Sequence, residues 1–206
     1  KVGAVVYHAA DADDANRYIV ELGLRKGVGF VVKAKSMVSE EIGLNGHLEQ
    51  GGYKVVETDL GEWNVQLTGE RPSHITAPAL HKTKEEVAEL FSRYFGRPVP
   101  ADIKEMVKIA RREMRRYFLE ADVGISGANL AIAESGTLVL ISNEGNARLV
   151  TALPPVHIAL VTVEKFVETM EQATALIKAL ITASSGLKMT SYVSFITGPS
   201  KTTDIE

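Results

Sequence analysis

The chemically most suggestive residue lies in a strand-like run of small side chains. This run, GISGANLAIAESGTLVLISNEGNARLV, extends from Gly124 to Val150, and its apolar part contains a single carboxylate, Glu134. Gly, Ala, Asn and Ser weaken a strand, whereas small residues allow close approach of a ligand or another chain segment. Glu134 could therefore act as a base, a nucleophile or a hydrogen-bond acceptor.

Two turns, SGAN and AESGT, and the segment after the next strand could supply further groups to the same cleft. The candidate ligand-binding residues here are Asn129, Ser135, Gly136, Thr137, Asn143 and Arg148, and Glu144 and Asn146 could also reach the cleft. A tight hairpin with Glu134 in a salt bridge explains the same pattern, so both interpretations stay open.

A second candidate site lies where a buried strand runs into KAKSMVSEE. Lys33, Lys35 and Ser36 fall at the start of the next helix. Two ammonium groups and free helix N–H groups would hold a phosphate or a carboxylate. The structural alternative is a capped helix beside two solvated lysines.

A third candidate site is the stretch ETDLGEW. Glu57, Thr58 and Asp59 leave a strand and enter a helix, where the acids could face the same cleft as Lys33 and Lys35. They would then pair with the lysines or bind substrate hydroxyls. The alternative is that Asp59 caps the helix.

Other motifs are missing or weak. His74, His81 and His157 have no standard metal-ligand spacing, so structural roles are expected and no metal site is predicted. The sequence contains no nucleophile elbow and no glycine-rich dinucleotide fingerprint after a strand.

Composition narrows the protein class. The 206 residues carry a net charge of −3 and contain no cysteine. The slight acidity gives no reason to expect nucleic acid as a partner, and thiolate-bound metals and clusters are excluded within these residues. No apolar run reaches the roughly 20 residues of a membrane span. A cytoplasmic protein is expected, and the first residue, Lys1, favours a fragment of a longer chain.

The candidate sites must be positioned by alternating strands and helices. Strand-like runs are expected near 1–7, 28–34, 53–58, 122–142, 156–163 and 190–198, and PSHITAPA (72–79) is expected to be a strand or an extended loop. Helices are expected near 11–27, 36–52, 59–69, 83–96, 101–121 and 168–184, and Thr83 and Glu86 have the spacing of a capping box. This alternation predicts an α/β fold with three layers: a mostly parallel sheet with helices on both faces. Residues 1–206 are expected to form a single domain.

Several long motifs together resemble the lactate-utilisation protein B family. They are VVKAKSMVSEEIGLN, VVETDLGEW, PSHITAPALHKT, ADVGISGANLAIAESGTLVLISNEGNARLVTALPPVHIALV and TSYVSFITGPSKTTDIE. The resemblance implies a lactate-utilisation (LUD) domain, followed in family members by a ferredoxin-like module with iron–sulfur clusters. It also implies a bacterial cytoplasmic system that oxidises L-lactate to pyruvate, with other subunits as partners.

The resemblance further implies a fold similar to the ribose-phosphate isomerase, glucosamine-phosphate isomerase and CoA-transferase group. Sugar-phosphate isomerases use a D-G-A-D turn, but Ser126 and Asn129 occupy the two acidic positions here. CoA transferases use a glutamate before a glycine, which Glu134 and Gly136 resemble faintly.

Three hypotheses follow. In the first, the chain is a domain of an iron–sulfur component, binds an organic acid, a cofactor or a partner subunit, and is not a complete dehydrogenase. No cofactor is expected within this segment, and a homo-oligomer stays open. In the second, the chain is a transferase or isomerase that uses Glu134. In the third, it is a non-catalytic interaction module.

Overall fold

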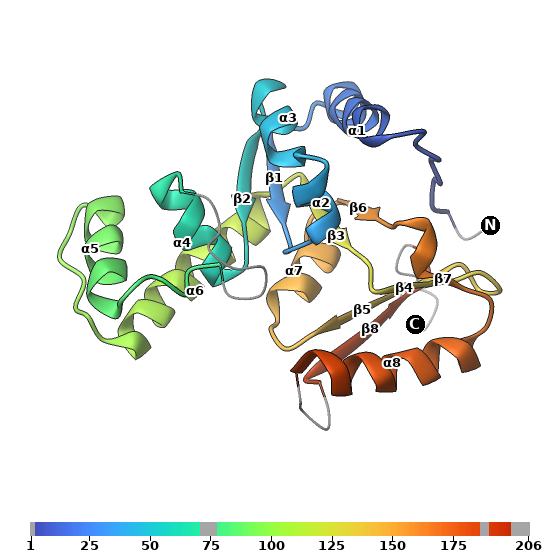
Figure 1. Ribbon diagram of the computed structural model, residues 1–206. Helices are drawn as coiled ribbons and strands as arrows, with labels where there is room; N and C mark the ends of the chain where they lie inside the picture. The colour runs from blue at the N-terminus through green and yellow to red at the C-terminus, as the bar shows by residue number, and fades with distance from the viewer. Residues whose placement is uncertain (1–2, 71–77, 186–189, 199–206) are drawn as a thin grey trace, which may run out of the picture.

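The computed structural model describes residues 3–70, 78–185 and 190–198. Its centre is a parallel sheet of four strands in the order β2-β1-β3-β6 (Figure 1). The strands are β1 (Phe30–Lys33), β2 (Lys54–Glu57), β3 (Val123–Gly127) and β6 (Val156–Leu160). The chain continues from β1 to β2 on one side of β1, and it later returns to form β3 on the other side. The direction of the connections therefore reverses between β1 and β3.

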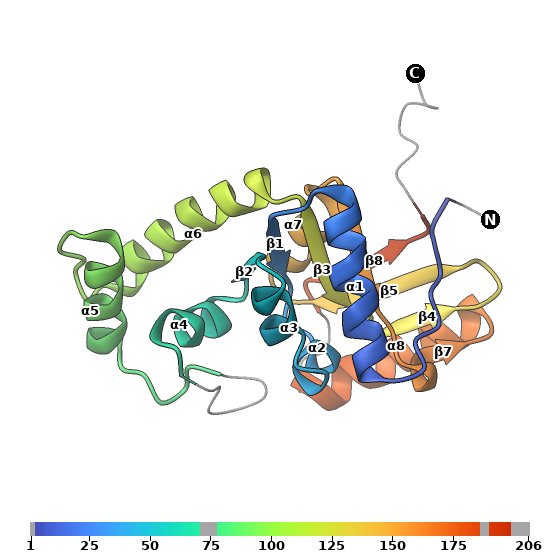
Figure 2. The ribbon, with the colours of Figure 1, turned by 90° about the horizontal axis from the view of Figure 1, so that it is seen from above.

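Helices cover both faces of this sheet, which confirms the predicted α/β class (Figure 2). One face packs against α1 (Ala12–Lys26), α2 (Met37–Glu41) and α3 (Leu44–Gln50). The other face packs against α4 (Leu60–Thr68), α6 (Ile103–Glu120) and α7 (Asn146–Ala152), with α5 (Lys84–Phe95) outside against α4 and α6. Alternate residues of β1 show the division, since Val31 belongs to the first core and Val32 to the second.

A second sheet, which the sequence analysis did not anticipate, follows the order β7-β4-β5-β8. Its strands are β4 (Leu130–Ile132), β5 (Thr137–Ser142), β7 (Phe166–Val167) and β8 (Tyr192–Ile196), and a short 3-10 helix, η1 (Val163–Lys165), precedes β7. The pairs β4–β5 and β5–β8 are antiparallel. Helix α8 (Met170–Ser185) covers one face through Ala173, Ile177 and Ile181. The small-residue run from Gly124 to Val150 therefore crosses from one sheet into the other.

Helix ends follow the expected local rules, with one difference. Thr83 and Glu86 form the predicted capping box of α5, and Asp59 caps α4 by accepting a hydrogen bond from the Glu62 amide. The single helix predicted near 36–52 is instead two helices. The chain turns at Gly43, whose φ of 63° lies in the left-handed region that favours glycine.

Close packing explains two of the small residues in β3. A Cβ on Gly124 would lie 1.9 Å from the carbonyl oxygen of Val150. The close packing of α7 against β3 therefore requires a glycine at this position. A Cβ on Gly127 would lie 2.7 Å from Ser36 Oγ, which brings the end of β3 directly against the start of α2. Small size here reflects contact between chain segments.

The start of the chain differs from its prediction. Residues 3–10 are exposed and lie outside both sheets, although a strand was expected near 1–7. Part of the predicted extended segment PSHITAPA, including His74, lies outside the described residues. None of the helices in the described ranges is long and apolar enough to cross a membrane.

Candidate functional site

Two of the three predicted site regions meet at the carboxyl ends of β1 and β2. Lys33 and Glu57 are the last residues of these strands and lie opposite each other in the sheet register. Their side chains form an ion pair, with 2.9 Å between Lys33 Nζ and Glu57 Oε1. Both residues are almost fully buried, at 1% and 5% exposure. The ammonium of Lys33, which was predicted to bind a ligand, is thus paired with Glu57, one of the predicted acids.

Two further side chains complete what we call the inner network, which consists of Lys33, Ser39, Asn45 and Glu57. Lys33 Nζ donates to Ser39 Oγ at 2.8 Å, and Asn45 Nδ2 donates to Glu57 Oε1 at 2.7 Å. Buried Glu57 Oε2 and Asn45 Oδ1 have no hydrogen-bond partner within the described part of the chain. Buried polar atoms are seldom left unpaired, so these oxygens can accept donors from a water or a ligand.

A second charge contact, which we call the outer pair, joins Lys35 to Glu62. Lys35 Nζ lies 3.2 Å from Glu62 Oε1, but neither atom makes a well-aligned hydrogen bond with any residue that the structure describes. The side chain of Lys35 is 23% exposed, whereas that of Glu62 is 8% exposed. Burial raises the pKa of Glu62, against the opposing effect of Lys35, and the nearby acids Glu40 and Glu57 raise it further.

Polar groups from three connections surround these pairs. Thr58 Oγ1 donates to the Lys33 carbonyl at 2.9 Å and accepts from Asn146 Nδ2 at 3.4 Å. Glu144 is an exposed residue of the loop between β5 and α7; partial desolvation of its carboxyl and the charge of Asp59 raise its pKa, and Lys35 opposes this shift. The loop between β5 and α7 therefore reaches the lysine site, whereas Glu144 and Asn146 were predicted to reach the cleft of Glu134.

Ser36 contributes to the backbone of the site. Its side chain caps α2 by accepting from the Ser39 amide at 3.4 Å, and its carbonyl accepts from Ser39 Oγ at 2.7 Å. Gly127 of β3 abuts Ser36, so the site lies where the chain connections reverse between β1 and β3. Ligands of open α/β sheets commonly bind at such a point.

The turn that carries Glu134 lies elsewhere. Figures 1 and 2 both place the β4–β5 turn at the outer end of the second sheet, away from the carboxyl end of β1. The exposed Glu134 accepts a hydrogen bond from the Met170 amide at 2.7 Å, at the start of α8. A carboxylate in this position stabilises a helix N-terminus. The structure therefore gives Glu134 a capping role, and a catalytic role stays a prediction.

The remaining predicted residues also make structural contacts. Asn129 Oδ1 accepts from the Ile141 amide at 2.8 Å, and Asn143 Oδ1 accepts from Thr190 Oγ1 at 3.0 Å. The guanidinium of Arg148 lies 4.9 Å from the centre of the Tyr192 ring. In the turn, Ser135 Oγ donates to Thr137 Oγ1 at 2.8 Å, next to Gly136 with its φ of 67°. These residues hold the second sheet together, and none of these contacts involves the lysine site.

Sequence reasoning missed Ser39, Asn45 and Glu62. Glu62 lies three residues after the helix cap Asp59, and acidic residues are common in the first turn of a helix. Nothing in the sequence therefore indicated that Glu62 pairs with Lys35. His157, in contrast, matches its structural expectation. Its Nε2 lies 2.8 Å from Ser126 Oγ, and burial lowers its pKa.

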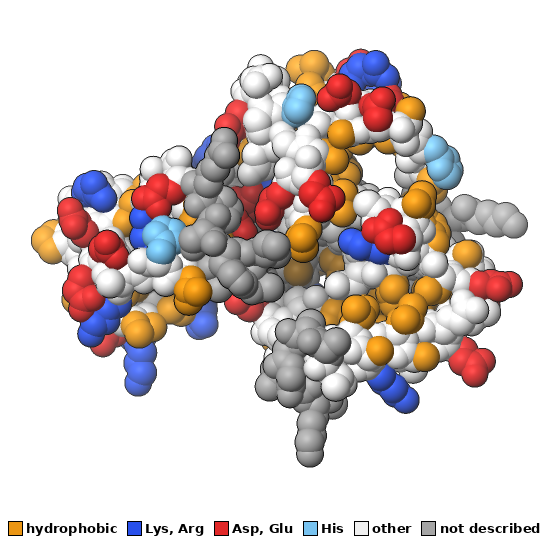
Figure 3. Space-filling model, viewed as in Figure 1, with side chains coloured by type: hydrophobic (Ala, Val, Ile, Leu, Met, Phe, Trp, Pro, Cys, Tyr) orange, Lys and Arg blue, Asp and Glu red, His pale blue; other side chains and the backbone are white. Residues whose placement is uncertain are grey.

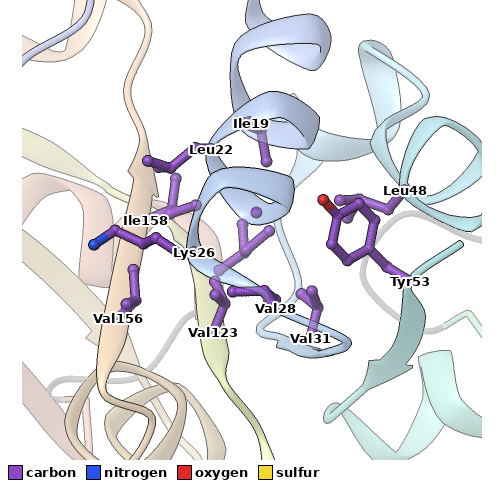
Figure 4. A pocket seen from close by; sticks show the side chains of 12 residues that line it. Ile19, Leu22, Lys26, Val28, Val31, Leu48, Tyr53, Val123, Val156 and Ile158 are labelled. Carbon is purple, nitrogen blue, oxygen red and sulfur yellow. The ribbon is translucent and has the colours of Figure 1, made fainter. Parts of the chain in front are cut away.

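Two hollows lie outside these networks. The one beneath α1 is lined mainly by apolar side chains such as Ile19, Leu48 and Tyr53 (Figure 4), and its volume of about 10 Å³ suits at most one water. A groove of about 300 Å³ lies between α4, α5 and α6. Among the residues that the structure describes, no group of three or more His, Cys, Asp or Glu could hold a metal ion.

The fold and site define an α/β domain with paired lysines and glutamates at the carboxyl edge of its parallel sheet. The LUD domain model matches residues 1–206. Lactate utilization protein B of Shouchella clausii is 47% identical over 207 residues, covering 100% of this chain and 44% of that protein. The chain belongs to the LUD domain family.

Other relatives agree with this assignment. Lactate utilization protein B of Geobacillus kaustophilus is 46% identical, with coverage of 100% of this chain and 44% of that protein. An Escherichia coli protein named uncharacterized electron transport protein YkgF is 41% identical, with coverage of 96% and 42%. The chain spans less than half the length of these curated relatives.

Among solved structures, a DUF162 family protein from Deinococcus radiodurans matches with a TM-score of 0.35 and 16% identity, covering 91% of this chain and 89% of that one. At this level of similarity the fold rests on the chain's own elements. The predicted likeness to sugar-phosphate isomerases and CoA transferases stays a prediction.

Proposed function

We propose that this chain is the ligand-binding part of an iron–sulfur component that oxidises L-lactate to pyruvate. The proposal is supported by relatives named lactate utilization protein B that match the whole chain at 46–47% identity. The relative named as an electron transport protein supports a role beside electron carriers. In this proposal the protein works in the cytoplasm with the other subunits of a lactate-oxidising complex.

The division of labour follows from composition. Protein side chains do not carry out hydride or electron chemistry without a cofactor, and these residues contain no cysteine for an iron–sulfur cluster. The clusters would therefore be held outside this segment, and this domain would bind the organic acid. It is not by itself a complete dehydrogenase.

The observation that carries the proposal is the state of Lys35. Lys33 is committed to Glu57 and Ser39, whereas the side chain of Lys35 is partly exposed and its buried ammonium, paired with Glu62, makes no well-aligned hydrogen bond to a described residue. Lys35 is thus the lysine of this site that can bind the carboxylate of a small organic acid.

Growth on lactate tests this role. A bacterial strain that lacks its own protein would be complemented with the full-length protein carrying Lys35→Met, and growth on L-lactate as sole carbon source would be lost. The matched control is Lys104→Met, which removes an exposed lysine of α6 and should leave growth unchanged. Normal growth of Lys35→Met at equal protein level would contradict the proposal.

The partner subunits could contact α8. Its outer surface exposes Met170, Leu176 and Leu180, and hydrophobic side chains gather there in Figure 3. Such a surface fits a contact with another protein. No structural observation favours transferase or isomerase chemistry at Glu134, because its carboxylate is bonded to the start of α8.

A further inference from the structure

The outer pair is an unusual ion pair because it is largely buried and its two closest atoms make no well-aligned hydrogen bond to any described residue. Lys35 Nζ and Glu62 Oε1 are both inaccessible to water, and they lie 3.2 Å apart without a well-aligned bond. Removing two charges from water is costly unless hydrogen bonds accompany the pairing. Each partner therefore retains the capacity to bind another group, and Glu62 as a whole is only 6% exposed.

Negative charge exceeds positive charge around the outer pair. Three charged residues face Glu62. They are Lys35 on the β1–α2 connection, Glu40 on α2 and Glu57 on β2. On the side of the β5–α7 loop, Lys35 faces Glu144, which also faces Asp59.

The neighbouring lysine is already paired. In the inner network, Lys33 is bound to Glu57 and Ser39. An entering anion would therefore meet Lys35 together with several carboxylates. The added negative charge favours protonation of the most buried of them.

We propose that Lys35 binds the carboxylate of a small monocarboxylic acid, and that Glu62, displaced from Lys35, takes up one proton from solvent in the same step. This inference rests on the proposed function, which makes an organic acid the ligand. The ligand anion replaces Glu62 beside the ammonium, and the new carboxylic acid group donates a hydrogen bond to it. No covalent bond other than that between the proton and Glu62 is formed.

The charges also restrict the class of ligand. A second carboxylate on the ligand would need a second cation, and Lys33 cannot leave Glu57 without exposing a buried charge. A monocarboxylate therefore fits the single ammonium of Lys35. Dicarboxylates of similar size should bind much more weakly.

Calorimetric titration of the purified full-length protein with L-lactate and with pyruvate tests the inference. Titrations at one pH in buffers of different ionisation enthalpy give the number of protons taken up per ligand. We expect about one proton per monocarboxylate, and affinity that falls about tenfold per pH unit where Glu62 is charged in the free protein. Succinate serves as the dicarboxylate comparison.

Two variants locate the proton. Glu62→Gln should bind the same acids with almost no proton uptake and with little dependence on pH, whereas Lys35→Met should lose binding. Lys104→Met is the matched control and should behave like the wild type. Differential scanning calorimetry would show that each variant is folded.

The outcomes separate this inference from the proposed function. Binding without proton uptake by the wild type, or unchanged uptake by Glu62→Gln, would overturn the inference and leave the proposed function intact. Absence of monocarboxylate binding would also overturn it. The proposed function fails separately if Lys35→Met supports normal growth on lactate.

Discussion

The carboxyl edge of the parallel sheet and the β4–β5 turn each place a glutamate among small or polar residues, but in opposite environments. Glu57 is 5% exposed and retains a buried oxygen without a partner. Glu134 is exposed and its carboxylate is bonded to the Met170 amide. A local hydrogen bond explains the position of the exposed Glu134. The buried Glu57, in contrast, retains an oxygen that can accept a further hydrogen bond.

The strongest test of this difference is to break the inner network. Lys33→Met should lower the free energy of unfolding by about 3–5 kcal/mol, because Glu57 would remain buried without its counter-charge. Denaturant unfolding followed by circular dichroism measures the change. The double variant Lys33→Met, Glu57→Leu should recover much of the loss. A single variant as stable as the wild type would contradict the importance of this pair.

A smaller effect is expected at the turn. Glu134→Ala should lower the free energy of unfolding by about 1 kcal/mol, since it removes one acceptor from the start of α8. Hydrogen exchange should show the loss at the first turn of α8. Glu134→Gln is the matched control, because its amide oxygen can still accept the Met170 hydrogen bond, and it should also support growth on lactate. A loss as large as that of Lys33→Met would break the comparison.

The smallest effect is a pH-dependent one at Glu144. The folded state raises the pKa of this carboxyl. The group has no effect on folding below its unfolded-state pKa, and its effect against folding grows as the pH rises and is complete above the raised, folded-state pKa. Glu144→Gln should therefore stabilise the protein at pH 7–8 relative to pH 4, by less than about 1 kcal/mol because water screens this group. Thermal unfolding across pH measures the difference. Equal stabilisation at both pH values would contradict the assigned cause.

Much of the local structure could be predicted from residue patterns. The cap at Asp59, the capping box at Thr83 and Glu86, and the apolar strands of the parallel sheet all depend on neighbouring residues, and all are confirmed. The turn at Gly43 was missed because a helical pattern continues on both sides of it. The second sheet was missed because β5 pairs with β8, about fifty residues further along the chain.

The candidate site divides in the same way. Its lysines and several of its acids follow from one rule, that polar residues after buried strands gather at the carboxyl edge of a parallel sheet. The partner of each lysine does not follow from that rule. The strand register places Lys33 opposite Glu57, and the packing of α4 brings Glu62 to Lys35.

The sequence by itself determined the α/β class, the family and the residue types at the carboxyl edge, because these depend on local periodicity and on long continuous motifs. Only the tertiary structure decided which charges are buried, paired or free to bind. Burial and pairing are set by segments distant in the chain, as when Gly127 meets Ser36 or the Met170 amide bonds to Glu134. The free energy of a charged group depends on those neighbours, and so does its role.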